Sequence, residues 1–268
     1  MSGKRVAAVQ MVSGPEIAQN LRDAGALVAE AAGRGAALVA LPEYFPLISA
    51  DEKDKFRARE KDGAGPLQDF LSETAARNKV WLVGGSIPLE AGAEGKVRNS
   101  CLVYDDAGRR VARYDKMHLF GFTQGEESYD ESRAIEAGET VVTFDSPVGR
   151  AGLSICYDLR FPELYRAMGA VDLLLVPAAF THTTGQAHWE LLLRARAVEN
   201  LCYVLAAAQG GLHPSGRRTW GDSMVVDPWG IVLDRLPQGP GLVLAEIDAA
   251  RIAERRAALP ALEHRRFS

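Results

Sequence analysis

Three ionisable residues each follow an apolar, strand-like segment, and together they could carry out acyl transfer. Glu43 follows "ALVALP", Lys116 follows "RVARYD", and Cys156 ends the apolar run "AGLSIC". A free cysteine thiol titrates near about 8.5, so it needs a base to become a nucleophile at neutral pH. A carboxylate in a partly apolar pocket is a stronger base than a solvated one, and a lysine can stabilise an oxyanion. This set of residue types suits covalent attack on an amide carbonyl.

Each of the three residues also has a structural explanation when it is taken alone. A single cysteine at the end of a strand is a packed core thiol about twice as often as it is a nucleophile. Cys101 and Cys202 lie inside apolar segments with no charged neighbour beside them, so we expect both to be core thiols. A glutamate after a proline often caps a helix, and a lysine after a strand usually faces solvent. The residue types alone therefore leave both interpretations open.

The composition of the 268-residue chain narrows the possible partners and compartments. Hydrophobic residues make up 47% and charged residues 25% of the chain, which is an ordinary globular composition. The net charge of −4 and the lack of Lys/Arg runs argue against a nucleic-acid-binding surface. The N-terminus lacks the apolar stretch of a signal peptide, and no segment approaches the roughly 20 apolar residues that cross a bilayer. We therefore expect a cytoplasmic protein without a membrane partner.

Apolar runs alternate with helical patterns along the chain and predict an α/β fold. Strands are expected at residues 5–12, 36–42, 80–88, 171–180, 202–210 and 241–248. Helices are expected at residues 15–32, 67–78 and 188–201 and from about 249 to 259, with hairpins at 99–116 and 141–156. Continuously apolar strands favour sheets that are covered on both faces. No linker or repeat interrupts the chain, so we predict one domain over residues 1–268 with a tail from about 260.

Three longer motifs, in order along the chain, resemble the signatures of the nitrilase superfamily, the carbon–nitrogen hydrolases. They are "LPEYF", "YDKMHLF" and "GLSICYDLRFPELYR", and the resemblance runs from about residue 5 to residue 267. It implies a four-layer α-β-β-α sandwich with two mixed β-sheets. It also implies a catalytic triad in which Glu43 is the general base, Lys116 the catalytic lysine and Cys156 the nucleophile.

A second active-site glutamate often accompanies this triad in the family. Its best match is Glu131 in "DESRAIEAGE", where it would orient Lys116 and the amide nitrogen of the substrate. The preceding segment, "GFTQGEESYD", offers Glu126 and Glu127 as alternatives. The assignment between the three glutamates is left open by the sequence.

The mechanism that the resemblance implies uses a cysteine thioester and needs neither a metal nor an organic cofactor. Glu43 would take the thiol proton of Cys156 as the sulfur attacks an amide carbon. The Lys116 ammonium and the backbone N–H of Tyr157 would hold the oxyanion. Glu43 would return the proton to the departing ammonia and then activate the water that releases a carboxylic acid.

The segments "PAAFTHTTGQAHWELLLRARAVENLCYVLAAAQGG" and "TWGDSMVVDPWG" resemble the family branch that contains deaminated glutathione amidases and ω-amidases. This resemblance implies an amidase for a small α-keto acid amide, with deaminated glutathione as the first choice. The alternative is an ω-amidase that acts on α-ketoglutaramate or α-ketosuccinamate. A different class of protein, a non-catalytic redox sensor with an oxidisable Cys156, is the third possibility, and a metallohydrolase is the fourth.

Several residues beside these segments are candidates for substrate binding. Arg160 could form a bidentate contact with a substrate carboxylate, or it could pair with Asp158 or Glu163 as a structural clamp. The rim of the site would be completed by Tyr157, Phe180, Thr181, His182 and Thr183.

The remaining histidines and the charged helix have structural interpretations. His182 and His188 lack the spacing of a zinc motif and a third ligand, and His188 is expected near the start of a helix. His118 is expected to pack beside Lys116, and residues 194–200 to form a buried network of ion pairs and caps. Because family members commonly pair through the helix after the nucleophile, residues 160–169 are a candidate surface for a homodimer or higher homo-oligomer.

Overall fold

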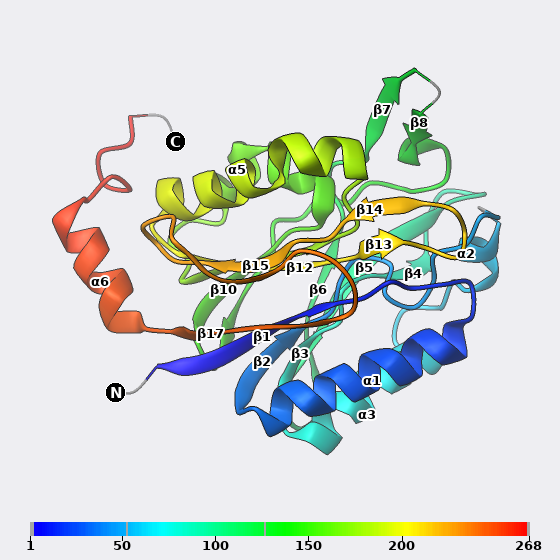
Figure 1. Ribbon diagram of the computed structural model, residues 1–268, viewed down its shortest axis with the longest axis horizontal. Coiled ribbons are helices and arrows are strands. Elements are labelled where there is room, and N and C mark those ends of the chain that lie inside the picture. Colours follow the sequence, from blue (N-terminus) through cyan, green and yellow to red (C-terminus); the bar gives the residue numbers. More distant parts are fainter. Residues whose placement is uncertain (1–2, 52, 126, 267–268) are drawn as a thin grey trace.

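Two β-sheets packed face to face form the centre of the computed structural model, which describes residues 3–51, 53–125 and 127–266. Helices α1 (Ile17–Gly33) and α3 (Pro66–Asn78) cover the outer face of one sheet. Helices α4 (Pro162–Ala167) and α5 (His182–Asn200) cover the outer face of the other (Figure 1). The predicted four-layer α-β-β-α sandwich is confirmed.

The first sheet has the strand order β17-β1-β2-β3-β5-β4, with β6 paired to β5. Strands β1, β2 and β3 are parallel to one another and the other pairings are antiparallel, so the sheet is mixed, as predicted. Its strands are β1 (Lys4–Gln10), β2 (Ala36–Ala40), β3 (Trp81–Val83), β4 (Ile87–Glu90), β5 (Val97–Tyr104), β6 (Arg110–Asp115) and β17 (Gly241–Ile247). Because β6 is antiparallel to β5 and β5 to β3, the carboxyl end of β6 lies at the same edge as that of β2.

The second sheet has the strand order β16-β15-β12-β11-β10-β9, with a parallel centre formed by β10, β11 and β12. Its strands are β9 (Thr143–Ser146), β10 (Gly149–Leu153), β11 (Leu173–Ala178), β12 (Tyr203–Ala208), β15 (Ser223–Val226) and β16 (Val232–Leu236). All six residues of β11 and of β12 are buried, which explains why these strands are continuously apolar rather than alternating.

Alternate side chains of β1 point to opposite faces of its sheet and enter two different core clusters. Val6 and Ala8 face the second sheet and belong to the core cluster between the sheets. Ala7 and Val9 point the opposite way, into the cluster that includes the buried face of α1. Each face of the strand is therefore covered, one by the other sheet and one by a helix.

Smaller elements surround the edge where functional residues gather. They are α2 (Asp54–Arg57), β7 (Gly121–Gln124), β8 (Glu127–Asp130), η1 (Glu131–Arg133), η2 (Cys156–Arg160), β13 (Gly210–Leu212) and β14 (Arg218–Trp220). The β7–β8 hairpin projects from this edge and was not predicted (Figure 1). Helix α6 (Ala249–Ala258) lies at the opposite end of the molecule (Figure 1).

Two predicted elements differ from the structure for identifiable reasons. The strand expected at 80–88 is broken into β3 and β4 at Gly84 and Gly85. A Cβ on Gly85, which has φ of 55°, would lie 2.1 Å from the carbonyl oxygen of Pro42, so only glycine permits this close approach. Helix α5 begins at His182, six residues before the predicted start, because the hydroxyl of Thr181 accepts a hydrogen bond from the N–H of Thr184 and caps the helix.

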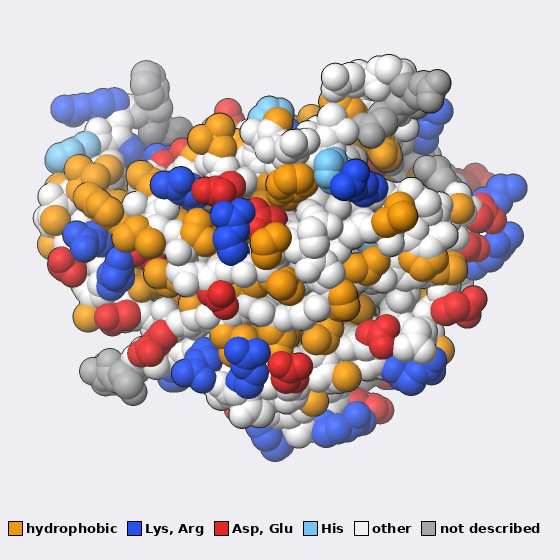
Figure 2. Space-filling view, viewed as in Figure 1, with side chains coloured by type: hydrophobic (Ala, Val, Ile, Leu, Met, Phe, Trp, Pro, Cys, Tyr) orange, Lys and Arg blue, Asp and Glu red, His pale blue; other side chains and the backbone are white. Residues whose placement is uncertain are grey.

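The surface carries charges of both signs. The face in Figure 2 shows acidic and basic side chains interspersed with apolar ones, without a large area of one sign. Among the described residues, no helix is long and apolar enough to cross a membrane.

Candidate active site

The three residues singled out by the sequence lie at one edge of the stacked sheets. Glu43 follows β2, Lys116 follows β6, and Cys156 lies just beyond β10 at the start of η2. Glu43 and Cys156 both line one narrow inner cavity, and Lys116 bonds to Glu43 directly. Segments more than 70 residues apart along the chain therefore meet at this edge.

Lys116 lies between two glutamates in the interior. Its Nζ donates to Oε1 of Glu43 at 2.9 Å and to Oε2 of Glu131 at 2.8 Å. The side chain of Lys116 is fully buried and that of Glu131 is 16% exposed. Glu131 thus occupies the position expected of the second glutamate, whereas Glu126 and the side chain of Glu127 lie outside the described residues.

Glu131 and the Lys116 ammonium hold each other in charged form. Burial alone would lower the pKa of Lys116, but the negative charges of Glu131 and Glu43 raise it well above its ordinary value of 10.5. Burial would likewise raise the pKa of Glu131, but the Lys116 ammonium keeps it below its ordinary value of 4.5. At neutral pH, Lys116 is therefore a fixed cation beside the reacting groups.

The thiol of Cys156 is buried beside Glu43 and protonated at rest. Burial and the negative charge of Glu43 raise the pKa of Cys156 well above its ordinary value of 9.0, although Lys116 acts in the opposite direction. The two side chains line the same inner cavity and Glu43 acts on the pKa of the thiol, so the carboxylate is placed to accept the thiol proton. A reaction at this sulfur would therefore need proton transfer during attack, because no standing thiolate is present.

Both catalytic turns use left-handed backbone at a residue other than glycine. Tyr44, directly after Glu43, has φ of 55°, and Cys156 has φ of 51°. Such conformations cost on the order of 1–3 kcal/mol each and persist where surrounding contacts fix them. For Tyr44, the backbone N–H donates to Ser86 Oγ at 3.0 Å, and the side-chain hydroxyl donates to Glu131 Oε1 at 2.9 Å.

Glu43 is oriented by two further donors that the sequence analysis did not identify. Asn99 Nδ2 donates to Oε1 of Glu43 at 2.9 Å, and the backbone N–H of Ala179 donates to Oε2 at 2.9 Å. Ala179 follows β11 of the second sheet, so Glu43 is bonded to both sheets. These partners fix the direction in which the carboxylate faces Cys156.

A buried aspartate ties the nucleophile segment to the lysine segment. Asp158 accepts hydrogen bonds from the hydroxyl of Tyr114 at 2.7 Å and from the N–H of Ile155 at 2.8 Å. It also accepts one from the N–H of His118 at 3.0 Å, and its Oδ1 lies 2.7 Å from Nδ1 of that histidine. The sequence offered only a weak signal, an acidic residue two positions beyond Cys156. The ring of His118 stacks on that of Phe161, and its packing beside Lys116 stays a prediction.

The structure gives Arg160 a different environment from the predicted clamp. Asp158 is engaged elsewhere, and within the described chain Arg160 forms no ion pair. Its guanidinium lies 5.5 Å from the ring centre of Phe180 and 5.8 Å from that of Tyr157, and its Nη1 is 3.3 Å from Nδ1 of His188. The clamp with Asp158 or Glu163 is therefore wrong, and the guanidinium remains free of a carboxylate partner.

The predicted rim residues divide into two groups. The inner cavity is lined by Glu43, Phe120, Glu131, Cys156, Tyr157, Ala179, Phe180, Thr181, Thr184 and Arg217. Tyr157, Phe180 and Thr181 are thus brought together with the reacting groups. Arg160, His182 and Thr183 are not among these lining residues; the ring of His182 packs against that of Trp220, with centres 5.2 Å apart.

The histidines do not form a recognisable ligand set. No group of three or more His, Cys, Asp or Glu residues in the described parts of the chain could hold a metal ion. His188 lies within α5 rather than at its start, because the helix already begins at His182. The predicted network at 194–200 is present, since Arg196 pairs with Glu199 at 2.9 Å and donates twice to the carbonyl of Leu159.

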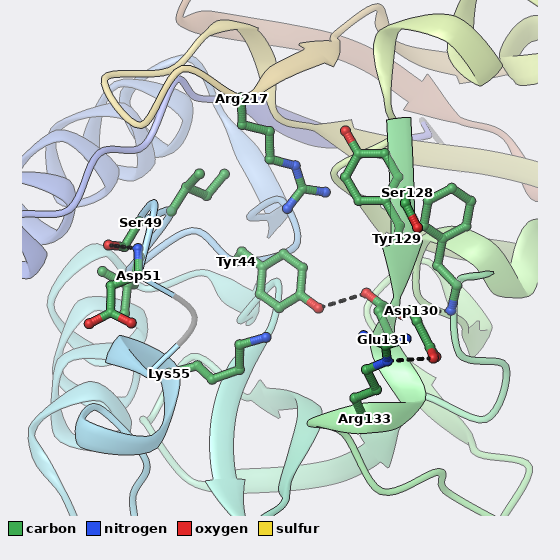
Figure 3. Close-up of a pocket in the computed structure, with 13 residues that line it drawn as sticks. Tyr44, Ser49, Asp51, Lys55, Ser128, Tyr129, Asp130, Glu131, Arg133 and Arg217 are labelled. Carbon is green, nitrogen blue, oxygen red and sulfur yellow. Dashed lines mark hydrogen bonds and ion pairs between the residues drawn. The ribbon is translucent and has the colours of Figure 1, made fainter. Parts of the chain in front are cut away.

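A second, outer cavity adjoins the inner one and was not predicted from the sequence. Its volume is about 370 Å³, and it lies between the loop that carries α2 and the β7–β8 hairpin (Figure 3). Phe120, Glu131 and Arg217 line both cavities, so the outer one leads to the reacting groups.

Comparisons with known proteins extend over nearly the whole chain. Residues 5–257 match the family described as carbon–nitrogen hydrolase. A deaminated glutathione amidase from Synechocystis is 42% identical, with 97% of each chain covered. The omega-amidase NIT2 of Mus musculus is 39% identical, covering 99% of this chain and 96% of the relative. The crystal structure of Saccharomyces cerevisiae Nit3, described as a member of branch 10 of the nitrilase superfamily, has a TM-score of 0.87 at 32% identity, covering 99% of this chain and 97% of that one.

Proposed function

This chain belongs to the carbon–nitrogen hydrolase family of amidases, and we propose that it hydrolyses a small α-keto acid amide, deaminated glutathione, through a thioester on Cys156. One observation carries this proposal: Cys156, Glu43 and Glu131 line one inner cavity, and Lys116 donates to both glutamates. The similarity to deaminated glutathione amidases supports the choice of substrate.

The first half of the reaction forms the thioester. Glu43 takes the proton of the Cys156 thiol as sulfur bonds to the amide carbon, and the carbonyl electron pair moves to oxygen. The Lys116 ammonium and the backbone N–H of Tyr157 stabilise this oxyanion. When the oxyanion collapses, the carbon–nitrogen bond breaks, and Glu43 delivers its proton to the departing nitrogen.

The second half of the reaction releases the acid. Glu43, again a carboxylate, takes a proton from a water molecule that attacks the thioester carbon. The carbon–sulfur bond then breaks, and the proton returns to the sulfur of Cys156. Glu131 keeps Lys116 in position through its 2.8 Å hydrogen bond and balances the ammonium charge throughout.

The departing group depends on what the amide nitrogen carries. The ammonia expected from the sequence is released only from a primary amide such as α-ketoglutaramate, and this expectation is wrong for deaminated glutathione. In deaminated glutathione the amide nitrogen belongs to a cysteinylglycine dipeptide, so the departing group is the amine of that dipeptide. Both substrates give the same acid, 2-oxoglutarate, and Glu43 protonates the nitrogen in both.

This shared product allows a direct test of the substrate. The purified protein is supplied with deaminated glutathione or α-ketoglutaramate, and 2-oxoglutarate formation is measured with a coupled dehydrogenase. We expect kcat/KM for deaminated glutathione to be higher by at least about tenfold, within the range that pocket contacts provide. A preference for α-ketoglutaramate would instead identify an ω-amidase, the second candidate, which the similarity to NIT2 supports.

The same assay separates an amidase from the other classes. In Glu43→Gln, the carboxylate that accepts the thiol proton becomes a neutral amide of equal size, and turnover should fall about 10²–10⁴-fold. A redox sensor would hydrolyse neither amide, and a metallohydrolase would lose activity in a chelator that leaves the thioester mechanism unaffected.

We also propose that the protein forms a homodimer through the exposed face of α5. Leu191 on this face is 67% exposed, and Arg194 Nε donates to the carbonyl of Gly230 at 2.8 Å, which joins α5 to a turn with exposed Trp229 and Ile231. The predicted surface at residues 160–169 lies beside this face, because α4 packs against α5. Exposed apolar side chains on two joined elements favour a protein partner. A cytoplasmic location remains a prediction from the sequence.

Introducing a charge on this face should separate the subunits. We expect Leu191→Asp to shift the wild-type dimer to monomer in size-exclusion chromatography with light scattering. Leu212→Asp is the matched control, because Leu212 is 70% exposed but lies on β13. A wild-type protein that is monomeric at all concentrations would contradict the proposal.

A further inference from the structure

Two cations point into the outer cavity from opposite sides. Arg217 lies in the segment before β14, and Lys55 lies on α2. Figure 3 shows the guanidinium of Arg217 and the ammonium of Lys55 both directed toward the space beside the Tyr44 ring. Because the two residues belong to separate elements, one positive charge lies on each side of the cavity.

The acidic residues of the outer cavity are already paired with other cations. Asp51 pairs with Arg57 at 3.2 Å, and Asp130 pairs with Arg133 at 3.0 Å. Glu131, the third acid, pairs with Lys116 as described above. The negative charges that line the cavity therefore do not neutralise the two cations that face it.

Arg217 and Lys55 themselves have no carboxylate partner. Neither forms an ion pair within residues 3–51, 53–125 and 127–266. Nη2 of Arg217 donates to the carbonyl of Ala179 at 3.2 Å, and its guanidinium lies 6.0 Å from the ring centre of Tyr129. Its Nε is buried and has no hydrogen-bond partner, which leaves a donor of a charged group unsatisfied. The guanidinium therefore keeps N–H groups at its Nη atoms that an anionic ligand in the cavity can engage.

The position of Arg217 connects this charge to the reaction. Because Phe120, Glu131 and Arg217 line both cavities, a substrate with its carbonyl carbon at Cys156 can extend from the inner cavity into the outer one. A volume of about 370 Å³ is within the range of small-ligand pockets. The outer cavity therefore suits a part of the substrate that is remote from the bond that breaks.

We propose that the outer cavity binds the departing half of the substrate, an amine that carries a carboxylate, and that Arg217 and Lys55 bind this carboxylate. The inference rests on the proposed function and adds a subsite to it. In deaminated glutathione, the departing half is a dipeptide that ends in a glycine carboxylate. A primary amide has no group that reaches the outer cavity, so this subsite favours peptide amides over ω-amides.

The decisive comparison uses two substrates that differ only in this carboxylate. One is deaminated glutathione, and the other is its analogue with the glycine carboxylate converted to a carboxamide. The ratio of their kcat/KM values isolates the contribution of the charge. We expect Arg217→Gln and Lys55→Gln each to lower this ratio about tenfold or more, the effect of losing one charge-assisted hydrogen bond. Two separate variants keep the test valid if one of them alters the local structure.

Lys53→Gln provides the matched control. Lys53 is exposed two residues before Lys55 and is not among the residues that line the outer cavity, so the ratio should not change in this variant. An equal fall in Lys53→Gln would indicate a general effect of positive potential and would overturn the proposal. An unchanged ratio in both Arg217→Gln and Lys55→Gln would overturn it as well.

A binding measurement separates this inference from the proposed function. Calorimetry measures the affinity for deaminated glutathione and for the carboxamide analogue. It is carried out with the Cys156→Ala variant and with the double variant Cys156→Ala, Arg217→Gln. A preference for the carboxylate that Arg217→Gln abolishes supports the subsite, even if the wild-type protein hydrolyses neither compound and the proposed function fails. Equal affinity for both compounds overturns the subsite, even if hydrolysis occurs.

Discussion

A Cys156→Ala variant is expected to lose at least about 10⁴-fold in amidase turnover, because no other group can form the thioester. Binding of the amide should persist, since the alanine leaves the remaining lining of the inner cavity in place. The loss of turnover is measured with deaminated glutathione as the substrate, by monitoring the formation of 2-oxoglutarate. Mass spectrometry of acid-quenched wild-type protein should detect the acyl group on Cys156 during turnover.

Cys202→Ala is the matched control for the loss of a buried thiol. Cys202 lies just before β12, at the sheet edge opposite the candidate site, and burial raises its pKa to about 12. A thiol of this kind is inert at neutral pH, so the variant should keep its turnover. Retained hydrolysis in Cys156→Ala, or an acyl group on a different residue, would contradict the proposed nucleophile.

Lys116→Met is expected to reduce both turnover and stability. Turnover should fall about 10²–10³-fold or more, because the oxyanion loses a cationic partner. The free energy of unfolding at pH 7 should fall by about 3–5 kcal/mol, the usual result of removing one partner from a buried charge network. In this variant, the carboxylates of Glu43 and Glu131 face one another without the ammonium that bridges them.

The pH dependence of stability should change sign in this variant. In the wild type, Glu131 has a folded-state pKa below 4.5, so its contribution is present above that pH and is lost as the pH falls through the folded-state pKa. Without Lys116, burial and repulsion from Glu43 raise the pKa of Glu131 above its value in the unfolded chain. The folded state then binds more protons than the unfolded state, and stability decreases as the pH rises from 5 to about 7.

Urea unfolding at several pH values measures this change. Lys61→Met is the control, since Lys61 is exposed and loses a charge of the same kind without affecting a buried pair. If Lys116→Met and Lys61→Met show the same stability at pH 7, Lys116 does not hold the two glutamates in the manner described.

The reacting residues could be predicted from the sequence because each stands in a distinctive local motif. Glu43, Lys116 and Cys156 end apolar strands, and strands with these directions bring their ends to one edge. The apolar residues at every position of β11 and β12 predicted sheets covered on both faces, and the resemblance to the nitrilase superfamily implied the four-layer sandwich.

The partners of the reacting residues could not be predicted, because long-range hydrogen bonds have no local signature. Asp158 bonds to Tyr114 across 44 positions, and Glu43 bonds to Ala179 across 136 positions. The outer cavity depends on the placement of α2 and the β7–β8 hairpin, two short elements with weak periodicity. Arg217, which lies in a polar loop, resembles a solvent-exposed arginine until the fold shows what it faces.

The buried contacts of Asp158 separate the positioning of the reacting groups from the lining of the outer cavity. Its contacts with Tyr114, His118 and Ile155 set the distance between sulfur and ammonium from beneath the site. The residues of the proposed outer subsite stand on other elements, α2, the β7–β8 hairpin and the segment before β14. New specificities can therefore evolve through substitutions in the outer cavity, while Glu43, Lys116 and Cys156 keep their positions.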